Sequence, residues 1–89
     1  MKEKEWTKVF KALGNENRLQ IIKLLYLRKS LSVSEIRNAL GISYKWTSFN
    51  LNNLSRIGIL ESKGMQGQVF YFLNPNLPDK VRKIIQIFL

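Results

Sequence analysis

Residues 32–54 of the chain read SVSEIRNALGISYKWTSFNLNNL, and two helices joined by a short turn fit this stretch. Ser32 followed three residues later by Glu35 predicts a capping box, the reciprocal pair of hydrogen bonds that starts a helix. Gly41 is expected to end that helix, because glycine readily takes the left-handed conformation of a helix end. Ser43 can then cap a second helix after a three-residue turn. This is the helix-turn-helix arrangement.

The second of these helices separates into a buried and an outward face at about 100° per residue. Thr47, Leu51 and Leu54 fall within one arc and are expected to face the core. The opposite arc is polar: Asn52 can bond adenine through two atoms, and Lys45 can reach guanine or phosphate. We therefore predict a recognition helix over residues 44–56 that lies in the major groove of double-stranded DNA. Its candidate DNA contacts are Ser43, Tyr44, Lys45, Ser48, Phe49, Asn52 and Arg56.

A hairpin is predicted after this helix, where the apolar pattern changes to a period of two residues. Residues 59–63 and 68–73 fit two strands, and the glycines of GMQG over residues 64–67 fit the loop between them. A hairpin directly after a helix-turn-helix is a wing, which can contact phosphate or the minor groove. The alternative for its two glutamines is a hairpin that only covers the core. The candidate DNA contacts of the wing are Lys63, Gln66 and Gln68.

Two further helices are predicted before residue 30. The first has one apolar stripe and stops at Gly14, and the second starts with a cap at Asn15. Its apolar face runs from Leu19 to Leu25, and it ends near Arg28 with cations that suit the helix dipole.

A last helix is predicted after Pro78, a residue that suits a first helical turn. The apolar stripes of the first and last helices exceed what so small a monomer readily covers, which predicts a homodimer. The alternative is that the last helix packs back on its own domain. A two-fold dimer would read half-sites about 34 Å apart. The predicted interface residues are Trp6, Val9, Phe10, Leu13, Val81, Ile84, Ile85 and Phe88.

These elements predict a mainly α-helical (α+β) fold with four helices, a small β-hairpin and a last helix, a winged helix-turn-helix in one domain over residues 1–89. Two uses of such a fold are open. A large aromatic side chain is usually buried, so we expect Trp46 to pack against a neighbouring segment. Phe49 has no obvious core to join and can contact a thymine methyl group. If Tyr44, Trp46 and Phe49 anchor a partner instead, the chain is a protein interaction module.

Composition narrows the function classes. Fifteen Lys and Arg against six Asp and Glu give a net charge of +9 over 89 residues, which indicates a polyanionic partner unless it only keeps the surface soluble. Cys and His are absent, so the usual metal ligands and nucleophile-base pairs are missing. We expect no enzyme activity, no cofactor and no metal ion. The N-terminal MKEKEW lacks the apolar segment of a signal peptide, and no run approaches ~18 apolar residues, so we expect a cytoplasmic protein without a membrane partner.

Four segments, taken in order, resemble the ArsR family of winged-helix transcriptional regulators. They read ALGNENRLQIIKLL (12–25), LSVSEIRNALGIS (31–43), TSFNLNNLSRIGIL (47–60) and GQVFYFLNP (67–75). The resemblance implies a homodimer that represses transcription. It also implies that residues 44–56 and the wing read DNA, and that the first and last helices form the dimer.

The chain differs from the metal-sensing members of that family. Residues 32–34 read Ser-Val-Ser where those members carry Cys-Val-Cys, and Asp79 is the only acid of the last helix. The resemblance therefore does not imply sensing of arsenic, zinc or cadmium. Residues 49–50 read Phe-Asn where many members have Arg-His, which implies a different operator. Arg18 matches a family arginine, for which we expect a structural or phosphate-side role.

Overall fold

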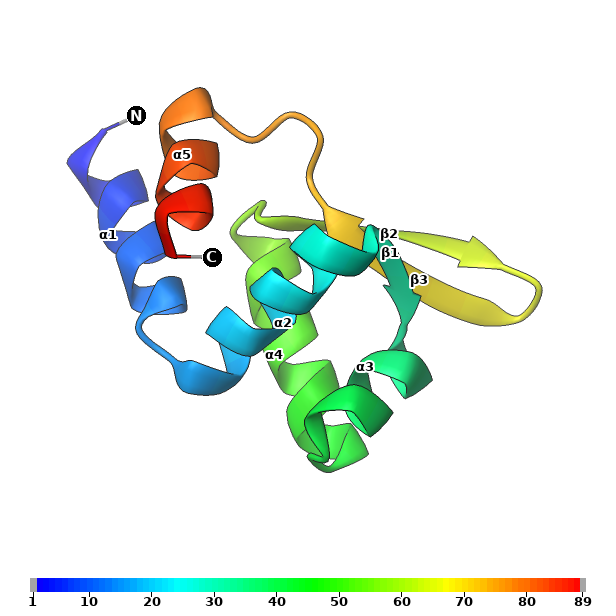
Figure 1. Ribbon diagram of the computed structural model, residues 1–89. Helices are drawn as coiled ribbons and strands as arrows, with labels where there is room; N and C mark the ends of the chain where they lie inside the picture. The colour runs from blue at the N-terminus through cyan, green and yellow to red at the C-terminus, as the bar shows by residue number, and fades with distance from the viewer. Residues whose placement is uncertain (1, 89) are drawn as a thin grey trace.

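The structure is a computed structural model that describes residues 2–88. Figure 1 shows α1 and α5 at one end of the molecule and the sheet at the other, with α2, α3 and α4 between them. The elements are α1 (Glu3–Leu13), α2 (Glu16–Arg28), β1 (Ser30–Ser32), α3 (Val33–Leu40), α4 (Tyr44–Arg56), β2 (Leu60–Met65), β3 (Gln68–Leu73) and α5 (Asp79–Phe88).

The helix boundaries follow the capping residues. The Asn15 side chain accepts a hydrogen bond from the Arg18 backbone N–H at 3.1 Å and starts α2. Ser32 Oγ accepts from the Glu35 N–H at 3.1 Å, and Glu35 Oε1 accepts from the Ser32 N–H at 2.9 Å, which is the predicted capping box. Gly41 has a φ of 66° and ends α3 in the left-handed conformation. These predictions are confirmed.

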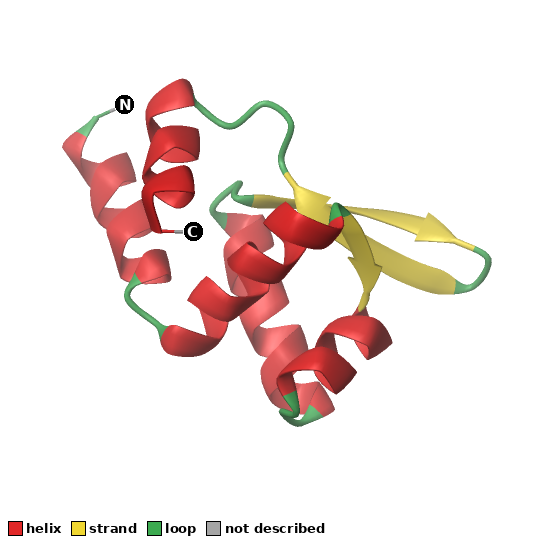
Figure 2. Ribbon diagram, viewed as in Figure 1, coloured by secondary structure: helices red, strands yellow, loops and turns green. Residues whose placement is uncertain are grey.

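The sheet has three strands where the sequence predicted two. Its order is β1-β3-β2, with both pairings antiparallel, and β1 pairs Leu31 with Tyr71. The predicted loop over residues 64–67 is too long, because β2 continues to Met65. The turn is the two-residue pair Gln66 and Gly67, with φ of 51° and 77°, as a twisted hairpin favours. The hairpin extends beyond the helices as a wing (Figure 2).

The core holds α4 by the face that its spacing predicted. Thr47, Leu51 and Leu54 are all 0% exposed. The prediction for Trp46 is wrong: this side chain is 56% exposed, because it extends from the flank of α4 and no neighbouring segment covers it. Leu19, expected on the buried face of α2, is 37% exposed.

The predicted interface residues of α1 and α5 fall into three groups. Val9, Leu13, Val81 and Ile85 are buried in the core of the single chain, because α5 packs one face back on its own domain. Within one chain these four side chains are already covered, so they are not free to meet a partner directly. The half-buried side chains packed against the core are Trp6 and Ile84, and the largely exposed ones are Phe10 and Phe88.

Candidate nucleic-acid interface

The start of α4 is fixed by its first residues. Ser43 Oγ accepts a hydrogen bond from the Trp46 N–H at 3.1 Å, and Thr47 Oγ1 donates to the Ser43 carbonyl at 2.9 Å. Ser43 is therefore the N-cap, and its exposed hydroxyl can still donate one hydrogen bond. The N-terminal N–H groups of a helix carry partial positive charge, which suits a nearby phosphate.

The outward side of α4 carries one continuous row of exposed side chains. At about 100° per residue they lie opposite Thr47 and Leu51. With 13 residues, α4 is about 20 Å long, enough to lie in a major groove. Ser48 is half-buried and borders this row rather than belonging to it. We call the row, which consists of Lys45, Phe49, Asn52 and Arg56, the reading row.

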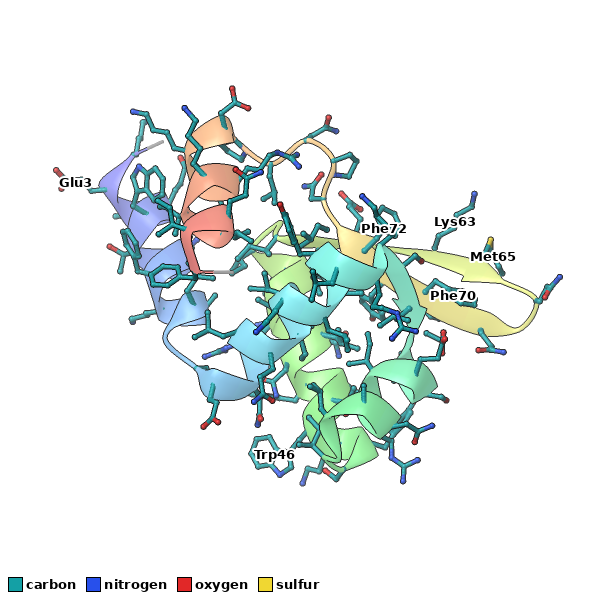
Figure 3. The ribbon with its side chains drawn as sticks, in the orientation of Figure 1. Glu3, Trp46, Lys63, Met65, Phe70 and Phe72 are labelled. Atoms are coloured by element: carbon teal, nitrogen blue, oxygen red, sulfur yellow. The ribbon has the colours of Figure 1, made fainter. Side chains whose placement is uncertain are left out.

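A hollow lies between the wing and the first turns of α3 and α4. This hollow of about 210 Å³, the wing hollow, is lined by residues 32–34 at the start of α3, Tyr44, and residues 67–69. Tyr44 and Gln68 therefore line the same hollow, and the exposed Gln66 lies at the turn. Lys63 pairs with Phe70 and lies on the outer face of the wing, away from the core (Figure 3).

Two aromatic side chains extend from the other flank of α4. The rings of Trp46 and Phe49 meet edge to face, with centroids 5.7 Å apart, and Figure 3 shows Trp46 near the N-terminal end of α4. They line a shallow hollow with Arg18 and with the residues that start α2. Phe49 is 54% exposed and Tyr44 is 59% exposed, so aromatic surface is open on both flanks of α4.

Two lysines of α1 lie beside α4 together with Arg18 of α2. A structural or phosphate-side role was expected for Arg18, whereas the sequence did not predict a role for the lysines. A hollow of about 270 Å³, the cation hollow, is lined by Lys8, Lys11, Ala12, Arg18, Asn53 and Ile57. The helical spacing of apolar residues in α1 predicted its apolar face but not the position of its lysines. The position of Lys8 and Lys11 next to α4 depends on how α1 packs, for which the local sequence carries no signal.

Ser32 stands where metal-sensing members of the resembled family carry a cysteine, and in this chain it has a structural role. Ser32 is buried and uses its hydroxyl in the capping box, and its N–H holds the pKa of the Glu35 carboxyl below the ordinary value. Within residues 2–88, no cluster of three or more His, Cys, Asp or Glu side chains is arranged to hold a metal ion. No helix in that range has the length and apolar character needed to cross a membrane.

The sequence profile described as "Bacterial regulatory protein, arsR family" matches residues 15–62, from the cap of α2 into β2. The chain belongs to the ArsR family. CadC, the cadmium resistance transcriptional regulatory protein of Listeria innocua, is 38% identical over 64 residues, which are 72% of this ArsR-family chain and 54% of CadC. The chain thus spans about half the length of that relative.

Two solved structures share the fold of this ArsR-family chain. HlyU from Vibrio cholerae has a TM-score of 0.84 and 31% identity, over 99% of this chain and 94% of HlyU. Mb0332 from Mycobacterium bovis, described as a homodimeric winged helix-turn-helix DNA-binding domain, has a TM-score of 0.81 and 27% identity, over 96% of this chain and 75% of Mb0332. The winged helix-turn-helix prediction is confirmed. The family consists of regulatory proteins and not of enzymes, as we expected from the residues.

Proposed function

We propose that this ArsR-family protein is a cytoplasmic, sequence-specific DNA-binding regulator of transcription that acts as a homodimeric repressor. The observation that carries the proposal is the reading row, which is exposed and free of acids along α4 while the opposite face is fully buried. A helix held by its core face presents such a row rigidly, which base recognition requires.

Each side chain of the reading row suits a different feature of the major groove. Asn52 can bond adenine through its amide, and Lys45 and Arg56 can donate to guanine or phosphate. Phe49 can contact a thymine methyl group. The residues at the rim of the groove have a second role, because phosphate contacts set the register of the protein on DNA. In the proposal these are Ser43, Tyr44, Ser48, Lys63, Gln66 and Gln68.

The dimer is proposed to form through the open faces of α1 and α5. Phe10 is 56% exposed and Phe88 is 68% exposed, and large exposed apolar side chains on neighbouring elements favour association. Trp6 and Ile84 are half-buried beside them and can extend the contact. The homodimeric Mb0332 supports this part of the proposal. Two copies of α4 would then read half-sites about 34 Å apart.

The proposal includes no metal effector. CadC is named for cadmium resistance, but Ser32 and Ser34 lack the thiolates that bind a soft metal. The Ser32 hydroxyl is also occupied by the capping box. Any signal to this protein would therefore act through other chemistry.

Fluorescence anisotropy tests the proposal directly. The protein is titrated into labelled duplex DNA from upstream of its own gene and into a scrambled duplex, across a series of salt concentrations. Specific complexes are typically ~10³-fold or more tighter than nonspecific ones, and phosphate contacts make the affinity fall steeply with salt. We expect the upstream duplex to bind more tightly than the scrambled one at ~150 mM salt. Equal weak binding to both would refute sequence reading.

The exposed aromatic residues favour one second candidate function, a winged-helix protein interaction module. Tyr44, Trp46 and Phe49 are each more than half exposed, and aromatic residues of this kind anchor protein interfaces. A hydrophobic protein contact depends weakly on salt, whereas phosphate binding depends strongly on it. If the protein binds no DNA at any salt concentration, this second candidate function is favoured.

A further inference from the structure

The cation hollow lies outside the helix-turn-helix and the wing. Lys11 suits the dipole at the end of α1, but this local effect does not account for three cations around one hollow. Lys8 and Lys11 stand three residues apart on α1 and are both exposed, a like-charge spacing that destabilises a helix slightly. Arg18 adds a third cation, and none of the residues that the structure places around the hollow is acidic. Such a concave cluster attracts an anion.

Arg18 is held at the edge of this hollow by the end of α1. Its Nη2 donates to the Lys11 carbonyl at 3.4 Å, a long hydrogen bond. Its Nε is shielded from solvent and has no hydrogen-bond partner among the described residues. The same side chain lines the neighbouring hollow of Trp46 and Phe49. The guanidinium is therefore placed between the lysines of α1 and the flank of α4, and its terminal N–H groups can donate further hydrogen bonds.

The cation hollow adjoins the reading row because α4 forms one of its walls. Asn53 and Ile57 line it, and each is the next residue after a member of the row, Asn52 and Arg56. Tyr44, which lines the wing hollow, lies on the opposite flank of α4 at about 100° per residue. A helix in the major groove has a phosphate backbone along each flank. One backbone then meets the wing side, and the other meets the cation hollow.

The adjacent surface is also positive on balance. A neighbouring hollow is lined by Glu5, Lys8, Val9, Arg56 and Ile57, with two cations and one acid. Positive charge thus continues from α1 to the last turn of α4. This continuity favours an extended phosphate backbone over a single free anion as the occupant.

We propose that Lys8, Lys11 and Arg18 form a second phosphate-binding surface, which contacts the DNA backbone on the flank of α4 away from the wing. This inference rests on the proposed function. In this inference, α1 and the first turn of α2 contribute to DNA affinity but do not read bases. These contacts would lengthen the stretch of DNA that the protein protects in a footprint, on the side of each half-site that α1 faces.

The test compares two double variants of equal charge. Lys8→Gln with Lys11→Gln removes two cations from the hollow, and Lys80→Gln with Lys83→Gln removes two exposed cations from α5. All four side chains are exposed, so both variants are expected to fold, which thermal melting by circular dichroism checks. The slope of log affinity against log salt should fall by about 0.9 for each phosphate that the protein no longer neutralises, so by about 2 per protomer in the hollow variant. The α5 variant should show less than half of that decrease.

Ethylation interference identifies the phosphates that the hollow binds. We expect modified phosphates on the backbone away from the wing to weaken binding by the wild type and the α5 variant, and to have a smaller effect on the hollow variant, which keeps only Arg18 there. Equal slopes and equal interference patterns in the two variants would overturn the inference while leaving sequence reading intact. Inorganic phosphate at constant ionic strength gives one more outcome. If it stabilises the wild type and the α5 variant but not the hollow variant, and the DNA slopes are equal, the hollow binds a free anion and the inference is overturned. Wild type that does not distinguish upstream from scrambled DNA would remove the proposed function, and this inference with it.

Discussion

Asn50 and Asn52 lie two residues apart on α4 and face opposite ways, so substitution of each should separate folding from DNA reading. Asn50 is 3% exposed, and its Nδ2 donates to the Trp46 carbonyl at 2.9 Å. Asn52 is exposed and belongs to the reading row. We expect Asn52→Ala to lower specific DNA affinity at unchanged stability. Asn50→Ala should instead lower the free energy of unfolding.

The structure sets the expected size of each effect. Loss of a bidentate bond to adenine costs about 1–3 kcal/mol for each half-site, which is roughly 5-fold to 150-fold in affinity. Alanine is the better helix former, so the Asn52 variant should be as stable as wild type or more stable by about 0.5 kcal/mol. The Asn50 variant has the same gain in helix propensity, but it loses one side-chain hydrogen bond, worth about 0.5–1.5 kcal/mol, and the packing of a buried side chain, so a net loss of stability remains. In a domain of this size each kcal/mol lowers Tm by about 4–8 °C.

Two assays on the same preparations separate the outcomes. Anisotropy with the upstream and scrambled duplexes gives the specificity ratio, and thermal melting by circular dichroism gives Tm. The Asn52 variant should lose specificity with the Tm of wild type, and the Asn50 variant should lose Tm while its folded fraction keeps the specificity. A folded Asn52 variant that binds the upstream duplex as tightly as wild type would refute the assignment of the groove-facing side of α4.

Four further outcomes are expected. Leu51→Ala, at a fully buried position, should cost about 2–5 kcal/mol in urea unfolding, and a loss below 1 kcal/mol would contradict the core. The Ser32 N–H holds the pKa of the Glu35 carboxyl below its ordinary value of 4.5. The stability that the ionised carboxyl adds is therefore present above that pH and is lost on acidification. Glu35→Gln should be less stable than wild type at pH 7, with a difference that shrinks towards pH 3. Phe88→Glu should split the dimer in light scattering, with Lys83→Glu as the exposed control on α5. Added zinc should leave Tm and DNA affinity unchanged, and a clear shift in either would contradict the expectation that the protein binds no metal.

The parts of the fold that sequence predicted are those with local signals. The capping box at Ser32, the left-handed Gly41 and the cap at Asn15 each depend on residues within one helical turn, so their patterns are visible in the chain. Strand β1 has three residues and pairs with β3, about forty residues later. So short a strand has no period to recognise, and its partner is set by the fold.

The candidate site shows the same limit. The apolar stripes of α1 and α5 predicted which faces are apolar but not what covers them, and within one chain Val9 and Val81 join the same core. The preference of Trp46 for burial is an average over proteins, and here its flank borders an open hollow. Lys8 and Lys11 gain their proposed role only through the packing of α1 beside α4.

The arrangement around α4 implies that specificity and affinity come from different elements. In the proposed complex the reading row meets base edges, while the wing hollow and the cation hollow meet the two backbones of the groove. The core holds α4 by a face that is 0% exposed at Thr47 and Leu51. The reading row therefore cannot move independently of the two hollows on either side of α4. A change of base pair should therefore alter affinity by an amount that salt hardly affects, because reading involves few phosphates. Removal of a flanking lysine should weaken binding to every sequence alike and leave the ratio between operator and scrambled DNA unchanged.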